Sequence, residues 1–92
     1  MEELLKLRKK IDLIDNQLIA LLGERFSLVN EVVAVKTKLG LPAVIPTRVE
    51  EVRERCKEIG ATYNLDKNFM HDLYTVIIDH YCEREDRFLK NK

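Results

Sequence analysis

Apolar residues recur at alternating steps of three and four along the first 38 residues, which is the spacing of a helix packing seam. This stretch contains no proline, and Gly23 is its only interruption. The pattern predicts one helix over residues 3–38, about 54 Å long at about 1.5 Å per residue. The seam consists of Leu4, Leu7, Ile11, Ile14, Leu18, Leu21, Leu28, Val32 and Val35.

Two shorter helices follow the stretch "KLGLPAVIP", whose glycine and two prolines predict a helix stop and a loop. Thr47 and Glu50 have the spacing of a capping box, which predicts a second helix that ends at Gly60. Asp66 is the predicted N-cap of a third helix that continues into a charged tail. The apolar stripes of these helices are Val49, Val52, Cys56 and Ile59 in the second, and Phe69, Leu73, Val76, Ile77, Tyr81 and Phe88 in the third.

No segment favours a strand, so we expect an all-α fold of three helices (long, short and medium) in a single domain over residues 1–92. A compact monomer of this size has a radius of gyration near 13 Å. Two short helices cannot cover so long an apolar seam, and the surplus needs another chain. We therefore predict an intertwined homodimer in which the first helix of each protomer packs along the other.

Sixteen basic residues balance sixteen acidic ones, so no global field favours nucleic acid or an anionic membrane. The apolar runs are too short for a membrane span, and the N-terminus lacks the pattern of a signal peptide. We expect a cytoplasmic protein. Cys56 and Cys82 lack metal-ligand and redox spacing, which favours reduced packing residues and predicts no metal site. His71 and His80 are interpreted as surface or interface residues.

Arg25 interrupts the apolar seam of the first helix, with Leu21, Leu22, Leu28 and Val29 one turn away. An unpaired charge in such a seam costs several kcal/mol, so Arg25 needs a partner. One candidate is an internal salt bridge with Glu24, Glu31 or a carboxylate of the third helix. The other is an anionic ligand enclosed by the helices.

Further cations favour the ligand. Lys36 lies about three turns beyond Arg25 on nearly the same face of the helix. Arg48 lies near the N-terminus of the second helix, where the backbone also favours anions. Arg8 is roughly 25 Å from Arg25 within one helix, but the partner's Arg8 can approach Arg25 in an antiparallel dimer. Cations that converge with few acids nearby indicate a site for a small ligand with more than one carboxylate.

The segment "LRKKIDLIDNQLIALLGERFSLVNEVVAVK" resembles the long first helix of the all-helical chorismate mutases, and the resemblance covers nearly the whole chain. It implies an enzyme that converts chorismate to prephenate by a concerted [3,3] rearrangement, without a cofactor or a covalent intermediate. By position, the partner's Arg8, Arg25 and Lys36 match the substrate-binding cations of the family, and Arg48 matches the arginine that starts the second helix. Glu85 occupies the place of a glutamine or glutamate.

This chemistry assigns a role to each of these residues. The cations clamp the two carboxylates of a flexible dianion and so supply its orientation. Negative charge builds on the ether oxygen as the C–O bond breaks, and preorganised donors there stabilise the transition state. Lys36 and Glu85 are the candidate catalytic donors. Glu85 can donate only when protonated, which burial favours; alternatively, it is a solvated member of the charged run "EREDR".

Ile45 and Val49 depart from the family pattern, because many members have Asp and Glu there and the Glu contacts the 4-hydroxyl group of the substrate. The segment "IP…RV" is similar to the corresponding segment of isochorismate-pyruvate lyases. This resemblance implies an alternative reaction that would give salicylate and pyruvate. The segments "GLP…P.RV" and "LYTVIIDHYCEREDRFL" resemble 4-amino-4-deoxychorismate mutases. The substrate therefore stays open between chorismate, its 4-amino analogue and isochorismate, and a non-catalytic helical interaction protein is a further alternative. Ile45, Val49 and Tyr81 complete the candidate substrate-binding residues.

Overall fold

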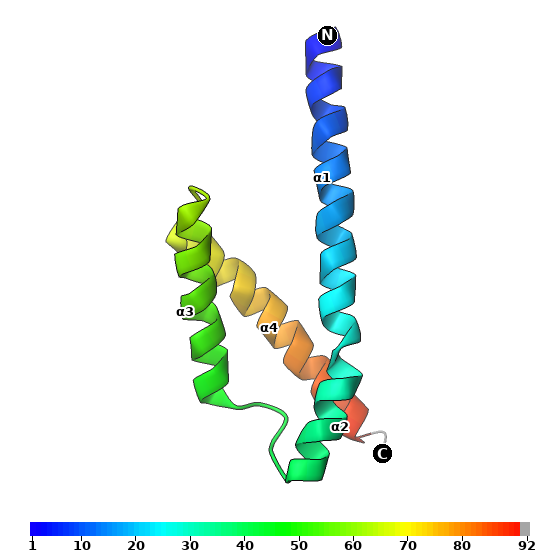
Figure 1. Cartoon of the computed structure of the whole chain (residues 1–92), viewed down its shortest axis with the longest axis vertical. Helices are drawn as coiled ribbons and strands as arrows, with labels where there is room; N and C mark the ends of the chain where they lie inside the picture. The colour runs from blue at the N-terminus through cyan, green and yellow to red at the C-terminus, as the bar shows by residue number, and fades with distance from the viewer. Residues whose placement is uncertain (91–92) are drawn as a thin grey trace.

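A computed structural model describes the backbone of residues 1–90 and the side chains of residues 1–87. Over this range the chain is helical without strands, which confirms the all-α prediction. α3 packs against α4, and α2 packs near the C-terminal end of α4, while α1 extends away from the other helices (Figure 1). The helices are α1 (Glu2–Ser27), α2 (Val29–Leu39), α3 (Pro46–Thr62) and α4 (Lys67–Lys90).

The predicted first helix is interrupted at Leu28, not at Gly23, and forms α1 and α2. The Leu28 N–H donates to the Arg25 carbonyl at 3.3 Å, three residues back, and Val32 N–H then donates to the Leu28 carbonyl at 3.0 Å. Leu28 keeps right-handed helical angles, with φ −76° and ψ −10°. The break therefore affects one turn, and α2 continues in roughly the direction of α1 (Figure 1).

Two predicted helix boundaries are confirmed. Gly40 ends α2 with a φ of 70°, and the following Leu41 N–H donates to the Lys36 carbonyl at 2.8 Å, as in a Schellman motif. Asp66 precedes α4, and its carboxylate accepts a hydrogen bond from the Asn68 N–H at 3.1 Å. The helix stop predicted at Gly40 and the N-cap predicted at Asp66 are thus observed where the sequence places them.

The predicted boundaries of α3 are wrong at both ends. α3 starts at Pro46 with Ile45 as its N-cap residue, so Thr47 lies inside the first turn and makes no capping bond. Proline at the first helical position sets the helix start here, because its fixed φ suits a helix and it has no N–H to satisfy. Gly60 does not end the helix, which continues to Thr62. Its Cβ position would lie 2.7 Å from Met70 Cγ, so Gly60 permits close packing of α3 on α4.

The core lies between α3 and α4 and extends to α2. Val49, Tyr74 and Cys82 pack against it. Both cysteines are free thiols, with Cys56 buried in the core, which confirms their interpretation as packing residues. The buried apolar side chains are Val29 and Val33 of α2, Val52 and Cys56 of α3, and Met70 and Ile78 of α4.

The predicted stripe of α4 is partly displaced from its buried face. Phe69, Leu73 and Val76 are exposed, whereas Met70, Ile78 and Glu85 are buried. Neighbouring helix positions point about 100° apart, so two apolar stripes run along α4 and α3 covers only one of them. The side chain of Phe88, which was assigned to this stripe, lies outside the described residues.

α1 contains no buried residue. Its seam residues are at least 43% exposed, and the chain measures 56 Å along its longest axis with a radius of gyration of 16.7 Å, against about 13 Å for a compact domain of this size. The chain thus leaves its long apolar seam uncovered, as the length argument expected. Within the described residues, no helix is both long enough and apolar enough to cross a membrane.

Candidate active site

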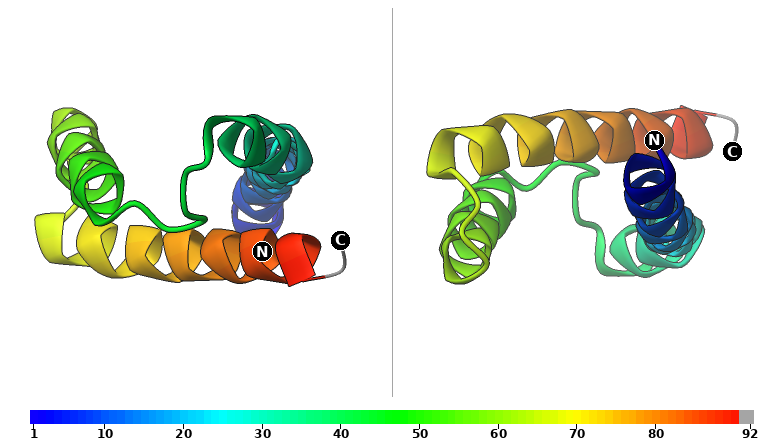
Figure 2. Two further views of the ribbon diagram at one scale, coloured as in Figure 1. Left: turned by 90° about the horizontal axis from the view of Figure 1, so that it is seen from below. Right: turned by 90° about the horizontal axis from the view of Figure 1, so that it is seen from above.

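A cavity of about 330 Å³ lies where α2, the loop after it, α3 and α4 meet. α2 and α3 lie on the same side of α4, with the loop between them (Figure 2). The volume of the cavity is that of a small-molecule site. The polar lining residues are Arg25, Lys36, Arg48, Tyr81, Cys82 and Glu85, and the apolar ones are Leu28, Val32, Ala43, Val44, Ile45, Val49, Val52 and Ile78.

All candidate site residues except Arg8 line this cavity. Arg25 lies in the last turn of α1 and Lys36 in the last turn of α2. The start of α3 contributes Ile45, Arg48 and Val49, and α4 contributes Tyr81 and Glu85. Arg8 is exposed near the free end of α1. Within one chain it does not join the other cations, as the predicted distance along the helix requires.

Lys36 and Glu85 form a largely buried ion pair in the cavity wall, with the Lys36 side chain 18% exposed and the Glu85 side chain 2% exposed. Lys36 Nζ donates to Glu85 Oε2 at 2.8 Å and to the backbone carbonyl of Ala43 at 2.6 Å. Glu85 is only 2% exposed, whereas its neighbours Glu83 and Asp86 face solvent. The alternative that Glu85 belongs to a solvated charged run is therefore wrong, because the packing of α4 turns this position inward.

Arg25 is half-buried, and its guanidinium carbon lies 5.3 Å from the centroid of the Tyr81 ring. Among the described residues no carboxylate lies within ion-pair distance of Arg25, so the predicted internal salt bridge with Glu24, Glu31 or α4 is not formed. The aromatic face is its partner instead. Arg48 is more exposed and forms an ion pair with Glu51, one turn along α3.

The electrostatic balance of the cavity favours an anion. Burial, helped by the Glu85 carboxylate, raises the pKa of Tyr81 above its ordinary value, although Arg25 opposes this. Burial and Glu85 likewise raise the pKa of the Cys82 thiol. Both groups are thus neutral at neutral pH, which leaves three cations against one carboxylate in the lining.

Sequence reasoning missed two polar parts of the lining. Cys82 lies three residues before Glu85, so helical spacing could have placed it on the same face. The Ala43 carbonyl carries no side-chain signal that a sequence pattern could detect. Both contribute to the surroundings of Lys36, the former through the lining and the latter through a hydrogen bond.

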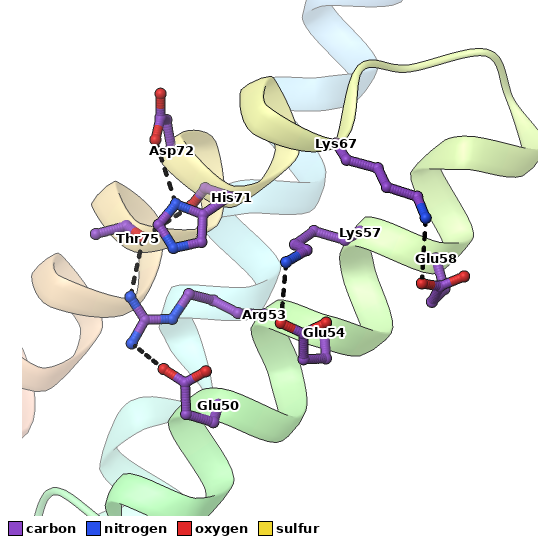
Figure 3. A network of polar contacts seen from close by, with 9 residues as sticks. All are labelled: Glu50, Arg53, Glu54, Lys57, Glu58, Lys67, His71, Asp72 and Thr75. Atoms are coloured by element: carbon purple, nitrogen blue, oxygen red, sulfur yellow. Dashed lines mark hydrogen bonds and ion pairs between the residues drawn. The ribbon is translucent and has the colours of Figure 1, made fainter.

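A second set of polar contacts lies on the surface of α3 and α4, outside the cavity (Figure 3). Arg53 donates to Glu50 at 2.9 Å and to Thr75 at 3.1 Å, and Lys57 pairs with the exposed Glu54 at 2.9 Å. Exposed pairs of this kind contribute little to stability. Within the described residues, no group of three or more His, Cys, Asp or Glu is arranged to hold a metal ion.

The two histidines are exposed, as predicted. His71 belongs to the surface contacts and lies 3.2 Å from Asp72 (Figure 3). His80 contacts the ring of Phe26 edge-on, with the ring centroids 5.2 Å apart. Neither histidine lines the cavity.

Comparison with known proteins agrees with this geometry. The sequence model of the family described as chorismate mutase type II matches residues 7–86. The chain belongs to this family. Membership in the chorismate mutase type II family makes it an isomerase enzyme, and the matched range includes every candidate site residue from Arg8 to Glu85.

Individual members of the chorismate mutase family have different names. The chain is 33% identical to the chorismate mutase of Methanocaldococcus jannaschii over 89 residues, which are 97% of this chain and 90% of that protein. It is 34% identical to the 4-amino-4-deoxychorismate mutase of Streptomyces venezuelae over 84 residues, 91% of this chain and 82% of that protein. It is 36% identical to a bifunctional chorismate mutase/prephenate dehydratase of Escherichia coli K12 over 76 residues, 83% of this chain and 20% of that protein.

The buried pair of Lys36 and Glu85 yields a prediction about stability. Lys36→Met leaves the Glu85 carboxylate buried without its cation, which is expected to lower the free energy of unfolding by about 3–5 kcal/mol. In a Glu85→Gln background the same change is expected to cost clearly less, because no buried charge is left behind. Urea unfolding of the four proteins at one fixed protein concentration measures both effects.

Lys57→Met is the matched control, because Lys57 pairs with an exposed carboxylate, Glu54. It is expected to change the free energy of unfolding by about 1 kcal/mol or less. Equal costs for Lys36→Met in the two backgrounds would contradict the ion pair.

Proposed function

We propose that the chain catalyses the [3,3] rearrangement of chorismate to prephenate or of 4-amino-4-deoxychorismate to 4-amino-4-deoxyprephenate. The observation that carries this proposal is the convergence of Arg25, Lys36 and Arg48 around one cavity that also holds the buried Glu85. Such a cavity suits a small dicarboxylate, and no metal or cofactor enters the reaction.

The cations divide the work between binding and catalysis. Arg25 and Arg48 hold the carboxylates and keep the enolpyruvyl arm folded over the ring. Holding the reacting atoms in this orientation lowers the entropic part of the activation barrier. Lys36 donates to the ether oxygen, on which negative charge builds as the C–O bond breaks. An ammonium has three donors, and Lys36 uses two of them on Glu85 and Ala43, so one is left for the substrate.

Glu85 is the second proposed donor to the ether oxygen. In the ligand-free chain its Oε2 accepts a hydrogen bond from Lys36, so the carboxylate must take up a proton before it can donate. Its position 2.8 Å from Lys36 Nζ brings both groups to the same point of the cavity. This proximity supports the proposal that Lys36 and Glu85 both donate to the ether oxygen of the substrate, as the resemblance implies.

The working unit is proposed to be a homodimer with shared active sites. The uncovered seam of α1 needs an apolar partner surface, and a second α1 offers the same seam. An antiparallel arrangement brings the partner's Arg8 toward Arg25 and adds a cation to the site. The exposure of the whole α1 seam in the single chain supports this assembly.

The choice of substrate depends on the wall formed by Ile45 and Val49. These side chains offer neither a hydrogen bond to a 4-hydroxyl group nor a carboxylate for a 4-ammonium group. Among the described lining residues the only carboxylate is Glu85, which is already paired with Lys36. Similarity to the Methanocaldococcus jannaschii protein favours chorismate, and similarity to the Streptomyces venezuelae protein favours the amino analogue.

The first test of this function is product identification. Purified protein is incubated separately with chorismate, 4-amino-4-deoxychorismate and isochorismate, and the products are identified by mass spectrometry. We expect prephenate or its 4-amino analogue. Salicylate with pyruvate from isochorismate would indicate a lyase instead, and no turnover of the three compounds would contradict an enzymatic role for the cavity.

Shared active sites predict complementation between two inactive variants. Arg8→Ala and Arg25→Leu are each expected to lose turnover, because each removes a cation from every site. After mixing and exchange of subunits, each mixed dimer contains one complete site. Random pairing at equal amounts is then expected to restore about a quarter of the wild-type activity per chain.

The control for this experiment mixes Arg8→Ala with an Arg8→Ala, Arg25→Leu double variant, a combination that creates no complete site. Activity that stays absent in the first mixture, although mass spectrometry shows mixed dimers, would place Arg8 outside the shared site. A monomer of 10.8 kDa at micromolar concentration would refute the dimer.

The proposed donor role of Glu85 predicts a dependence on pH. Only the protonated carboxyl donates, so kcat is expected to fall as the pH rises. Glu85→Gln supplies a donor that does not titrate and is expected to flatten the profile. Glu83→Gln, the same change at an exposed position of α4, is expected to keep the wild-type profile. An unchanged profile in Glu85→Gln would show that Glu85 is not the donor.

A further inference from the structure

The three cations of the cavity are held in different ways. Lys36 donates to Glu85 and to the Ala43 carbonyl, and Arg48 pairs with Glu51. Arg25 contacts the face of the Tyr81 ring, at 5.3 Å from its centroid. Among the described residues, only Arg25 combines partial burial with the absence of a carboxylate partner in the cavity wall.

An aromatic face is an unusual partner in one respect. It attracts a guanidinium through its negative π-surface but takes none of its five N–H donors. A carboxylate in the same place would occupy two of those donors in a bidentate pair. The ring therefore stabilises a half-buried charge in the ligand-free protein while leaving the donors available for another acceptor.

The Tyr81 ring is itself held in place. Phe26, which follows Arg25 in α1, lies against Tyr81 with ring centroids 6.2 Å apart and a tilt of 34°. Arg84 lies over the other ring of this pair, 5.5 Å from the centroid of Phe26. Burial raises the pKa of Tyr81, so the phenol is neutral at neutral pH and adds no competing charge. α1 and α4 are thus joined beside the cavity by a series of contacts that runs from Arg25 to the Tyr81 ring, then to the Phe26 ring and then to Arg84.

We propose that Tyr81 is a positioning residue that fixes the Arg25 guanidinium at the cavity wall with its donors free to bind a substrate carboxylate. The inference rests on the proposed function for the identity of the ligand, but the contact of ring and guanidinium stands apart from it. Tyr81 acts through Arg25 and needs no contact with the reacting atoms.

Two variants separate the ring from the hydroxyl group. Tyr81→Leu removes the aromatic face, and Tyr81→Phe keeps it. Tyr74→Leu is the matched control, because Tyr74 is a half-buried tyrosine two turns earlier in α4 that does not line the cavity. Thermal unfolding followed by circular dichroism checks that each variant is folded.

The first readout is the NMR signal of the Arg25 Nε–H in the ligand-free protein. A ring face shifts this proton upfield, and we expect the shift in the wild type, in Tyr81→Phe and in Tyr74→Leu but not in Tyr81→Leu. This measurement needs no substrate, so it decides the contact even if the protein turns over none of the three compounds. Absence of the shift in the wild type would overturn the proposal. This outcome decides the question even if Tyr81→Leu does not fold, because it needs no variant.

The second readout is steady-state kinetics with the substrate that the product assay identifies. Loss of the ring is expected to raise KM about three- to tenfold, the range of a partly desolvated cation–π contact, with a smaller change in kcat. Tyr81→Phe is expected to recover most of this loss. A wild-type KM in Tyr81→Leu, or an equal rise in Tyr81→Phe and Tyr74→Leu, would overturn the positioning role.

Discussion

The ion pair of Lys36 and Glu85 is the contact on which the geometry of the cavity depends, because it joins three separate segments. Lys36 belongs to α2, Glu85 to α4, and the Ala43 carbonyl that also receives a Lys36 hydrogen bond belongs to the loop between α2 and α3. Additional hydrogen bonds to the charged groups, such as the one to Ala43, help to offset the cost of burying a pair of this kind. The two hydrogen bonds that Lys36 donates, to Glu85 and to Ala43, also hold the loop that leads to Ile45, Arg48 and Val49.

The division of the apolar surface is the feature that favours the proposed homodimer. α2, α3 and α4 bury Val33, Val52 and Ile78 within the protomer, whereas α1 buries nothing. Among the described residues, the contacts of α1 with α4 lie at its last turn, where Arg25 and Phe26 meet rings and side chains of α4. A second copy that covers α1 would stabilise the helix and the position of Arg25 together, which couples assembly to the site.

Much of the site was predictable from helical spacing, and the failures have identifiable physical causes. Arg25 and Lys36 share a face because they are eleven residues apart, and the break at Leu28 hardly alters that relation. No glycine or proline marks the break at Leu28. It separates α1, which has no buried residue, from α2, which packs against α4. The inward direction of Glu85 was undecided from sequence, because it depends on how Met70 and Ile78 set the rotation of α4 against α3.

The strengths of the contacts also indicate how a dianion enters the cavity. Arg48 is paired with Glu51 in an exposed ion pair, which contributes little and is easily exchanged for a substrate carboxylate. Arg25 requires no exchange at all, because its partner is a ring face. Lys36 keeps its buried pair and still has one donor free. A bound dicarboxylate would therefore compete only with a solvated surface carboxylate for Arg25 and Arg48. The contact between Lys36 and Glu85 would change only when Glu85 takes up the proton that its proposed donor role requires.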